Sequence, residues 1–395
     1  MRSCDSPSAT IHSCFFGYIV QAIVNVYVPL LFVTFQNEFG LSLSQVTLLI
    51  TFNFGVQLLV DLLSVTFVDR IGYRASVVAA HVLAAAGLIL LAFLPNIMPP
   101  FAGILTSVTV YAVGGGLIEV VVSPIVESCP SKQKEKTMSL LHSFYCWGSV
   151  GVILLSTLFF SCFGIGQWKV LACVWALIPL YNIWNFATCP IERLTEEGKG
   201  MTIRALCKTP LFWLAIVLMV CAGASELSMA QWASAYTEAA LGFTKTLGDL
   251  IGPCLFAVTM GISRVIYGRY GAKMDLTRFM IGSGILCLCC YLLASLSKAP
   301  VLGLIGCVFC GFSVGIMWPG TISIVSPRLP QGGTALFALL AMAGDLGGAF
   351  GPSLVGTVTQ QAGDNLQAGM LVGSVFPLVL VLSLVMLNRH EAQRR

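Results

Sequence analysis

The chain has 395 residues, of which 57% are hydrophobic and only 10% are charged. Soluble domains carry roughly 25% charged residues, so this composition excludes an ordinary solvated surface and favours a protein that has lipid as its solvent. The net charge of +4 says little by itself, because in a membrane protein the position of the basic residues carries the information.

Apolar stretches of about 20 residues, the length a helix needs to cross roughly 30 Å of hydrocarbon, recur along the whole chain. They predict twelve spans, near residues 12–36, 45–68, 74–94, 98–126, 138–162, 168–188, 210–238, 247–268, 276–297, 299–325, 331–358 and 364–388. We expect prolines within them to bend some of the helices, the candidates being Pro29, Pro124, Pro179, Pro253, Pro319, Pro352 and Pro377.

Most of the 15 cysteines lie inside these apolar stretches, so they are expected to be small core residues instead of a disulfide framework. The cluster Cys287, Cys289 and Cys290 lies in the middle of a predicted helix with no histidine or carboxylate nearby in the sequence. We therefore predict no metal site and no cofactor.

Basic residues are distributed unevenly between the two sets of loops. If the N-terminus is cytoplasmic, only Lys169, Lys245 and Lys298 of the 21 basic residues are outside, Arg264 lies within a span, and all the others lie inside. Cytoplasmic loops carry the excess of Lys and Arg. Both termini are therefore predicted to be cytoplasmic, in a multi-pass protein of the cell membrane.

The longest polar stretch, residues 189–208, separates the sixth span from the seventh. It predicts a cytoplasmic linker between an N-terminal six-helix bundle at 1–188 and a C-terminal six-helix bundle at 209–395.

The two halves are related by an internal repeat, since a shift of 199 residues carries Arg70 onto Arg269 and Arg74 onto Lys273. Repeated halves, with the substrate held at their interface, are typical of alternating-access carriers.

Two short loops carry a recognisable motif. The loop after the second span reads Asp69-Arg70-Ile71-Gly72-Tyr73-Arg74, and the loop after the eighth span contains Arg269-Tyr270-Gly271-Ala272-Lys273. The first resembles the D-R-x-G-x-R core of the loop motif of the major facilitator superfamily, and the second resembles its weaker repeat. The resemblance covers nearly the whole chain. It implies an all-α membrane protein with twelve transmembrane helices in two pseudo-symmetric six-helix bundles.

Charged residues of these loops are predicted to have gating or structural roles, because Asp69 and the arginines could pair across the cytoplasmic ends of helices and stabilise one of two states. The residues concerned are Asp69, Arg70, Arg74, Arg269 and Lys273.

Within the superfamily, the fourth span resembles that of the fucose permease-like sugar:proton symporters. It reads Gly114-Gly115-Gly116-Leu117-Ile118-Glu119 and continues to Ser123-Pro124, with Ser123 where that group has Asn. The seventh span, from Gly223 through Glu226 to Trp232, is also similar to that group. The resemblance implies proton-coupled uptake of a small hydroxylated solute such as a sugar.

Ionisable groups within spans are the main functional candidates, since placing one in a bilayer costs at least about 2.5 kcal/mol. Glu119 lies among glycines, and burial favours the protonated form of a carboxylate, so Glu119 is the predicted proton carrier. His142 is the second predicted proton-coupling group. The alternative for each is a side chain that is simply hydrogen-bonded to a neighbouring helix.

The superfamily resemblance implies that the first, fourth, seventh and tenth helices line one cavity, joined by the second, fifth, eighth and eleventh. Gln21, Asn25 and Tyr145 are the predicted substrate-binding residues of the first half, and Glu226, Gln231, Trp232, Tyr236 and Trp318 are those of the second half. The alternative for the group around Glu226 is an outer gate or a packed helix end.

Arg264 and Asp345 lie within predicted spans, Asp345 among glycines that favour close helix packing. We predict that they form a structural lock. If Arg264 instead faces the cavity, the substrate is an organic anion.

Enzymatic functions and ATP-driven pumping are disfavoured because the sequence has no Walker loop, no Gly-x-Ser-x-Gly and no His-Glu-x-x-His. A second carrier alternative is the export of drug-like or amphipathic compounds, and a channel or a non-transporting receptor fits less well. The predicted partners are a small-molecule substrate, protons and membrane lipids, with no nucleic acid, and the chain is expected to be a monomer.

Overall fold

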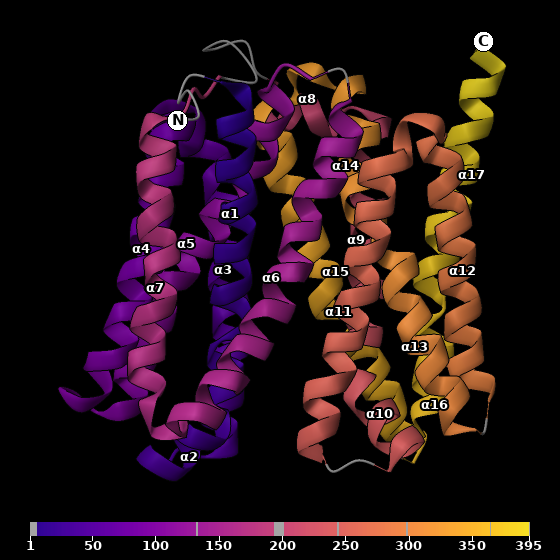
Figure 1. The fold of residues 1–395 in the computed structure, drawn as a ribbon. Coiled ribbons are helices and arrows are strands. Elements are labelled where there is room, and N and C mark those ends of the chain that lie inside the picture. Colours follow the sequence, from indigo (N-terminus) through magenta and orange to yellow (C-terminus); the bar gives the residue numbers. More distant parts are fainter. Residues whose placement is uncertain are drawn as a thin grey trace. The chain divides into compact units, whose positions relative to one another are not determined.

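The structure is a computed structural model that describes residues 6–131, 133–192, 201–242, 245–297, 299–363 and 365–394. These residues form helices and no strand (Figure 1). Twelve stretches among them are long and apolar enough to cross a membrane, which confirms the predicted number of spans. The boundaries differ by several residues, as in the first span, which runs from Pro7 to Phe39.

The described residues pack into two compact units. The first lies within 1–132, 144–200 and 333–338, and the second within 133–143, 201–332 and 339–395. Two helices, α6 (Lys134–Phe163) and α15 (Gly333–Gln361), contribute to both units. The bundle boundaries at residues 188 and 209 therefore stay a prediction.

In the first unit, α4 packs against α5 and α7, while α5 also packs against α1 and α3 (Figure 1). The helices of this unit besides α6 and α15 are α1 (Pro7–Val26), α2 (Phe32–Phe39), α3 (Leu43–Ile71), α4 (Tyr73–Phe93), α5 (Pro100–Ser128) and α7 (Trp168–Thr188), with 3-10 turns η1 (Val28–Leu31), η2 (Leu94–Asn96) and η3 (Ile165–Gln167).

In the second unit, α12 packs against α13 and α17, and α10 packs against α11 and α13. Its helices besides α6 and α15 are α8 (Ile203–Cys207), α9 (Pro210–Ala230), α10 (Ala233–Leu241), α11 (Lys245–Tyr270), α12 (Leu276–Leu296), α13 (Pro300–Val314), α14 (Met317–Val325), α16 (Leu366–Gly373) and α17 (Val375–Arg394), with 3-10 turns η4 (Gly271–Lys273), η5 (Ser326–Arg328) and η6 (Pro330–Gly332).

Prolines interrupt two of the spans, as expected. The first span breaks at η1, which contains Pro29, and the tenth breaks between α13 and α14, where Pro319 lies in the first turn of α14. Because proline has no backbone N–H, it cannot satisfy the carbonyl four residues earlier. Pro124 and Pro179, in contrast, lie inside continuous helices.

Glycines allow the closest helix contacts in each unit. In the first, a Cβ added to Gly116 of α5 would lie 2.9 Å from Cβ of Val60 and 3.1 Å from Cα of Gln57 on α3. In the second, a Cβ on Gly347 of α15 would lie 2.0 Å from the carbonyl oxygen of Val220 on α9. These small residues bring α3 against α5 and α9 against α15, and the first contact positions the polar groups described next.

Candidate functional site

A hydrogen-bonded network of amide side chains surrounds Glu119 in the first unit. Nε2 of Gln21 on α1 donates to Oε2 of Glu119 at 3.0 Å and to Oε1 of Gln57 on α3 at 2.9 Å. Nε2 of Gln57 in turn donates to Oδ1 of Asn25 at 2.8 Å. The carboxylate of Glu119 on α5 is therefore linked to α1 directly through Gln21, and to α3 through the bond between Gln21 and Gln57.

The network continues along α1 and α3. Nδ2 of Asn53 donates to Oδ1 of Asn25 at 3.1 Å, and Nδ2 of Asn25 lies 3.5 Å from the hydroxyl of Tyr145. Four of the predicted site residues, Gln21, Asn25, Glu119 and Tyr145, are thus brought together.

Gln57 and Asn53 were missed by the sequence reasoning, although both are buried, at 1% and 5% exposure. Their i, i+4 spacing on α3 matches that of Gln21 and Asn25 on α1, and this shared spacing is the signal that could have found them.

Glu119 itself follows glycines that bring α5 close to its neighbours. A Cβ on Gly115 would lie 3.2 Å from Oε1 of Gln21, so any larger residue there would push against the amide. One turn beyond Glu119, the hydroxyl of Ser123 lies 3.1 Å from that of Tyr18 on α1. Ser123, which stands where the resembling symporters have Asn, therefore continues the polar contact between α1 and α5.

Arg264 is the centre of a second cluster, in the second unit. Its guanidinium, 3% exposed, lies 3.6 Å from the carboxylate of Glu226 on α9. Nη1 donates to the carbonyl of His142 at 2.9 Å, and Nε donates to the carbonyl of Gly315 at 2.8 Å. The carboxylate next to Arg264 is that of Glu226, and the predicted lock between Arg264 and Asp345 stays a prediction.

The bond from Arg264 to Gly315 has a cause in the backbone. Residue 319, four positions after Gly315, is proline, so no helical N–H can reach the Gly315 carbonyl. A carbonyl left without a partner inside a protein costs free energy. Arg264 supplies the missing donor at the break between α13 and α14.

The other predicted residues of the second unit lie in α14, at the end of α9 and in α10. Trp318 packs its ring on Gly344 of α15, where an added Cβ would lie 2.2 Å from the indole. Gln231 and Trp232 form the break between α9 and α10. Tyr236 belongs to α10, and its side chain lies outside the described residues.

His142 and Asp345 lie within the helices of two spans. His142 is buried, at 4% exposure, near the start of α6, and Asp345 is half-buried on α15. The proton-coupling role of His142 and the structural role of Asp345 stay predictions.

The motif loop between α3 and α4 is tied down by hydrogen bonds. The hydroxyl of Thr334, at the start of α15, donates to Oδ1 of Asp69 and lies 2.8 Å from the hydroxyl of Tyr73. Thr334 is fully buried. Asp69 therefore contacts a hydroxyl from a distant part of the chain.

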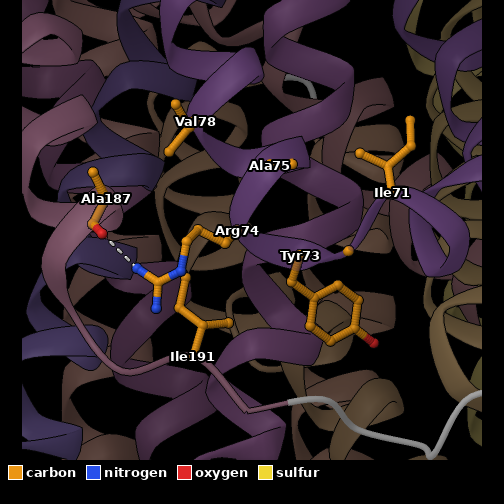
Figure 2. A pocket seen from close by; sticks show the side chains of 8 residues that line it. Ile71, Tyr73, Arg74, Ala75, Val78, Ala187 and Ile191 are labelled. Carbon is orange, nitrogen blue, oxygen red and sulfur yellow. Dashed lines mark hydrogen bonds between the residues drawn. The ribbon is translucent and has the colours of Figure 1, made fainter.

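Arg74 binds the C-terminal end of α7 (Figure 2). Its Nη1 donates to the carbonyl of Ala187 at 2.7 Å, the bond drawn in Figure 2. Nη1 also donates to the carbonyl of Phe186 at 2.9 Å, and Nη2 donates to that of Cys189 at 2.7 Å. The last carbonyls of a helix lack helical partners and carry partial negative charge, so a guanidinium stabilises this end.

Arg74 also lines a surface pocket of about 480 Å³ between α4 and the end of α7 (Figure 2). Arg70 in the same loop is exposed, as are Arg269 and Lys273 in the corresponding loop of the second unit.

No group of three or more His, Cys, Asp or Glu residues with the geometry of a metal site occurs in the part of the chain that the structure describes.

The profile of the Major Facilitator Superfamily matches residues 14–352. The chain therefore belongs to the major facilitator superfamily, a family of membrane transporters, as its loop motif predicted. No curated protein sequence matches it.

Solved structures share its fold over nearly the whole chain. FucP in the outward conformation, a transporter of this superfamily, has a TM-score of 0.81 at 16% identity, with 98% of this chain and 99% of that chain covered. The proton:xylose symporter XylE has a TM-score of 0.81 at 12% identity, covering 97% and 95%. The human organic anion transporter MFSD10 has a TM-score of 0.73 at 16% identity, covering 96% and 99%. Identities this low establish the fold alone.

Proposed function

We propose that the protein is a secondary active transporter that couples proton movement to the uptake of a small hydroxylated solute such as a sugar, by alternating access. The observation that carries this proposal is the amide network around Glu119. FucP, described as a fucose:proton symporter of E. coli in a second structure, and XylE share the fold, which supports the same class of reaction for this chain.

The network has the hydrogen-bonding capacity that a hydroxylated solute needs. Gln21 uses both amide hydrogens, on Gln57 and Glu119. Its Oε1 and Oδ1 of Asn53 are buried acceptors with no donor among the described residues. Buried acceptors are normally satisfied, so hydroxyl groups of a solute would complete these bonds.

The protonation state of Glu119 affects the hydrogen bonds of this network. A charged carboxylate accepts the hydrogen bond from Gln21, whereas a protonated one gains a donor of its own. Loading a proton therefore changes which hydrogen bonds the amides make. This is the link between proton and solute that a symporter requires.

Two indoles of the second unit have the chemistry that suits a sugar ring. Nε1 of Trp232 is a buried donor without a partner among the described residues, and Trp318 presents a second indole on α14. An indole provides an apolar face together with one hydrogen-bond donor, which suits a ring with hydroxyl groups.

The test is uptake of radiolabelled fucose, xylose and glucose by protein in liposomes. An inward gradient of about two pH units is worth about 2.7 kcal/mol, enough for about 100-fold accumulation. Glu119→Gln should lower the accumulation ratio to about one while exchange of solute at equal pH persists. Glu38→Gln, whose carboxylate binds Lys169 and Trp168, is the matched control. Uptake that ignores the gradient, or full accumulation by Glu119→Gln, would refute the proposal.

A second candidate function is organic-anion transport centred on Arg264. A buried guanidinium can bind a carboxylate substrate if the substrate takes the place of Glu226, and MFSD10, described as an organic anion transporter, shares the fold. This candidate requires that Arg264→Ala abolish anion binding in a folded protein. Anion binding that survives the substitution would exclude it.

A further inference from the structure

Asp61 is a carboxylate inside the membrane span of α3 that the proposed function does not use. Its exposure is 0%, and both side-chain oxygens are buried. It lies four residues after Gln57, which is one helical turn, or about 6 Å of rise. Asp61 therefore lies one helical turn beyond Gln57, the last amide of the network on α3.

Asp61 belongs to a polar stripe along α3. Asn53, Gln57, Asp61 and Ser64 recur at helical spacing and are 5%, 1%, 0% and 0% exposed. Leu59 and Leu63, in contrast, are 54% and 50% exposed. The stripe thus faces the interior of the first unit, and its amide members contact α1.

Glu119 and Asp61 are related through one pair of amides, because Glu119 contacts Gln21 and Asp61 lies one turn from Gln57 on α3. Gln57 precedes Asp61 by one turn, and Gln57 accepts from Gln21, which donates to Glu119 at 3.0 Å. The packing of Gly116 against Gln57 and Val60 holds this part of α5 on α3. This region therefore contains two carboxylates, Asp61 fully buried and Glu119 half-buried, although α1 contributes none.

Two charges of the same sign in a shared low-dielectric site disfavour each other, so one of two neighbouring carboxylates retains a proton. We propose that Asp61 is a second proton-binding group of this unit, linked to Glu119 so that the two carboxylates together hold one negative charge. This proposal rests on the proposed function in taking Glu119 as the proton carrier. It adds a second site to the coupling machinery.

The helices packed against α3 carry other titratable groups. They are Glu38 of α2, Tyr73, Arg74 and His81 of α4, Tyr111 and Glu127 of α5, and His12, Cys14 and Tyr18 of α1.

Three of these are engaged elsewhere. Arg74 binds the end of α7, His81 lies 2.9 Å from Nδ2 of Asn182, and Glu38 binds Lys169. Glu127, 5% exposed and two turns beyond Glu119 on α5, is the main competitor for the role of Asp61. It must be tested beside Asp61.

The experiment is infrared difference spectroscopy of the purified full-length protein during a pH titration, following the carbonyl stretch of protonated carboxyl groups. It needs no solute, so it is independent of whether the transported compound is a sugar. Subtracting the spectra of the Asp61→Asn/Glu119→Gln double variant cancels the bands of other carboxyl groups in the spans, such as Glu226. In these difference spectra the wild type should lose its carboxyl bands in two steps. Asp61→Asn and Glu119→Gln should each leave a single step, at a lower pH than the upper step of the wild type because the neighbouring charge is gone, whereas Asp61→Glu should keep two.

Controls separate this result from a packing effect. Ser64→Ala alters the same buried face of α3 without removing a titratable group and should keep both steps, and Glu127→Gln should also keep both. Two steps in Asp61→Asn, or the loss of a step in Glu127→Gln instead, would overturn the assignment. If each single variant keeps its remaining step at the same pH as in the wild type, the two carboxyl groups titrate independently, and the linked pair is refuted.

If Asp61→Asn fails to fold, the Asp61→Glu and Glu119→Gln titrations still decide between one and two linked steps. A failed sugar-uptake assay with a two-step titration would reject the proposed solute and retain the carboxylate pair.

Discussion

Arg264 shows how a single buried side chain can hold several parts of a unit together. It joins Glu226 of α9, the carbonyl of His142 on α6 and the Gly315 carbonyl that Pro319 leaves without a helical donor. Burying a guanidinium is costly unless its charge and its N–H groups all find partners. The arrangement favours a structural role for Arg264, because its donors are already used within the protein.

The Glu226–Arg264 pair predicts non-additive effects on stability. Removing one member of a buried pair typically costs about 3–5 kcal/mol, since the other charge is left without compensation. Glu226→Gln and Arg264→Met should each lower the melting temperature in detergent, and the double variant should lower it by less than the sum. A thermal double-mutant cycle measures this. Strict additivity would mean that the 3.6 Å contact contributes no coupling.

The sequence identified part of the candidate site because charged residues in an apolar span stand out. Glu119 and Arg264 are conspicuous for that reason, and the i, i+4 spacing of Gln21 and Asn25 indicated a shared face. Gln57 and Asn53 were missed because uncharged amides are tolerated in many membrane helices. Only their hydrogen-bond partners on α1 show that they belong to the site. The pairing of Arg264 with Glu226 likewise depends on tertiary packing.

At the scale of elements, hydropathy and proline positions predicted the spans well, because both act locally along the chain. The break at Pro319 follows from the missing N–H of proline, and the positive φ of Gly72, 91°, marks the tight connection between α3 and α4. The contact of Arg74 with α7 was not predicted. It joins residues more than 100 positions apart, beyond the reach of local patterns.

Arg74→Ala should loosen the end of α7. Hydrogen bonds to charged groups contribute about 1.5–3 kcal/mol, and because Arg74 is exposed we expect a loss nearer to about 1–2 kcal/mol. Hydrogen exchange should accelerate at the backbone amides of residues 184–189, where the helix ends. Arg70→Ala, in the same exposed loop, is the matched control and should leave this exchange unchanged. If exchange accelerates equally in both variants, the cause is the loss of a positive charge in this loop and not the loss of the hydrogen bonds from Arg74 to α7.

At the scale of the whole molecule, the distribution of basic residues between alternate loops predicts which loops face the cytoplasm. Basic residues predict cytoplasmic termini, since almost all of them lie in alternate loops. With that orientation, the end of α6 faces outward and the region of α8 faces inward. Two exposed cysteines, Cys162 near the end of α6 and Cys207 at the end of α8, therefore lie on opposite sides.

Labelling with a membrane-impermeant maleimide tests this orientation. Exposed thiols react, whereas buried thiols in apolar surroundings are inert. A third exposed cysteine, Cys289, lies inside the span of α12, where a membrane-impermeant reagent does not reach it. Intact cells should label Cys162, so Cys162→Ser should remove most of the signal while Cys207→Ser changes it little. After permeabilisation, the Cys207→Ser variant should lose a second portion of the label. Labelling of Cys207 in intact cells, with Cys162 protected until the membrane is opened, would place both termini outside and reverse the direction in which Glu119 would load its proton.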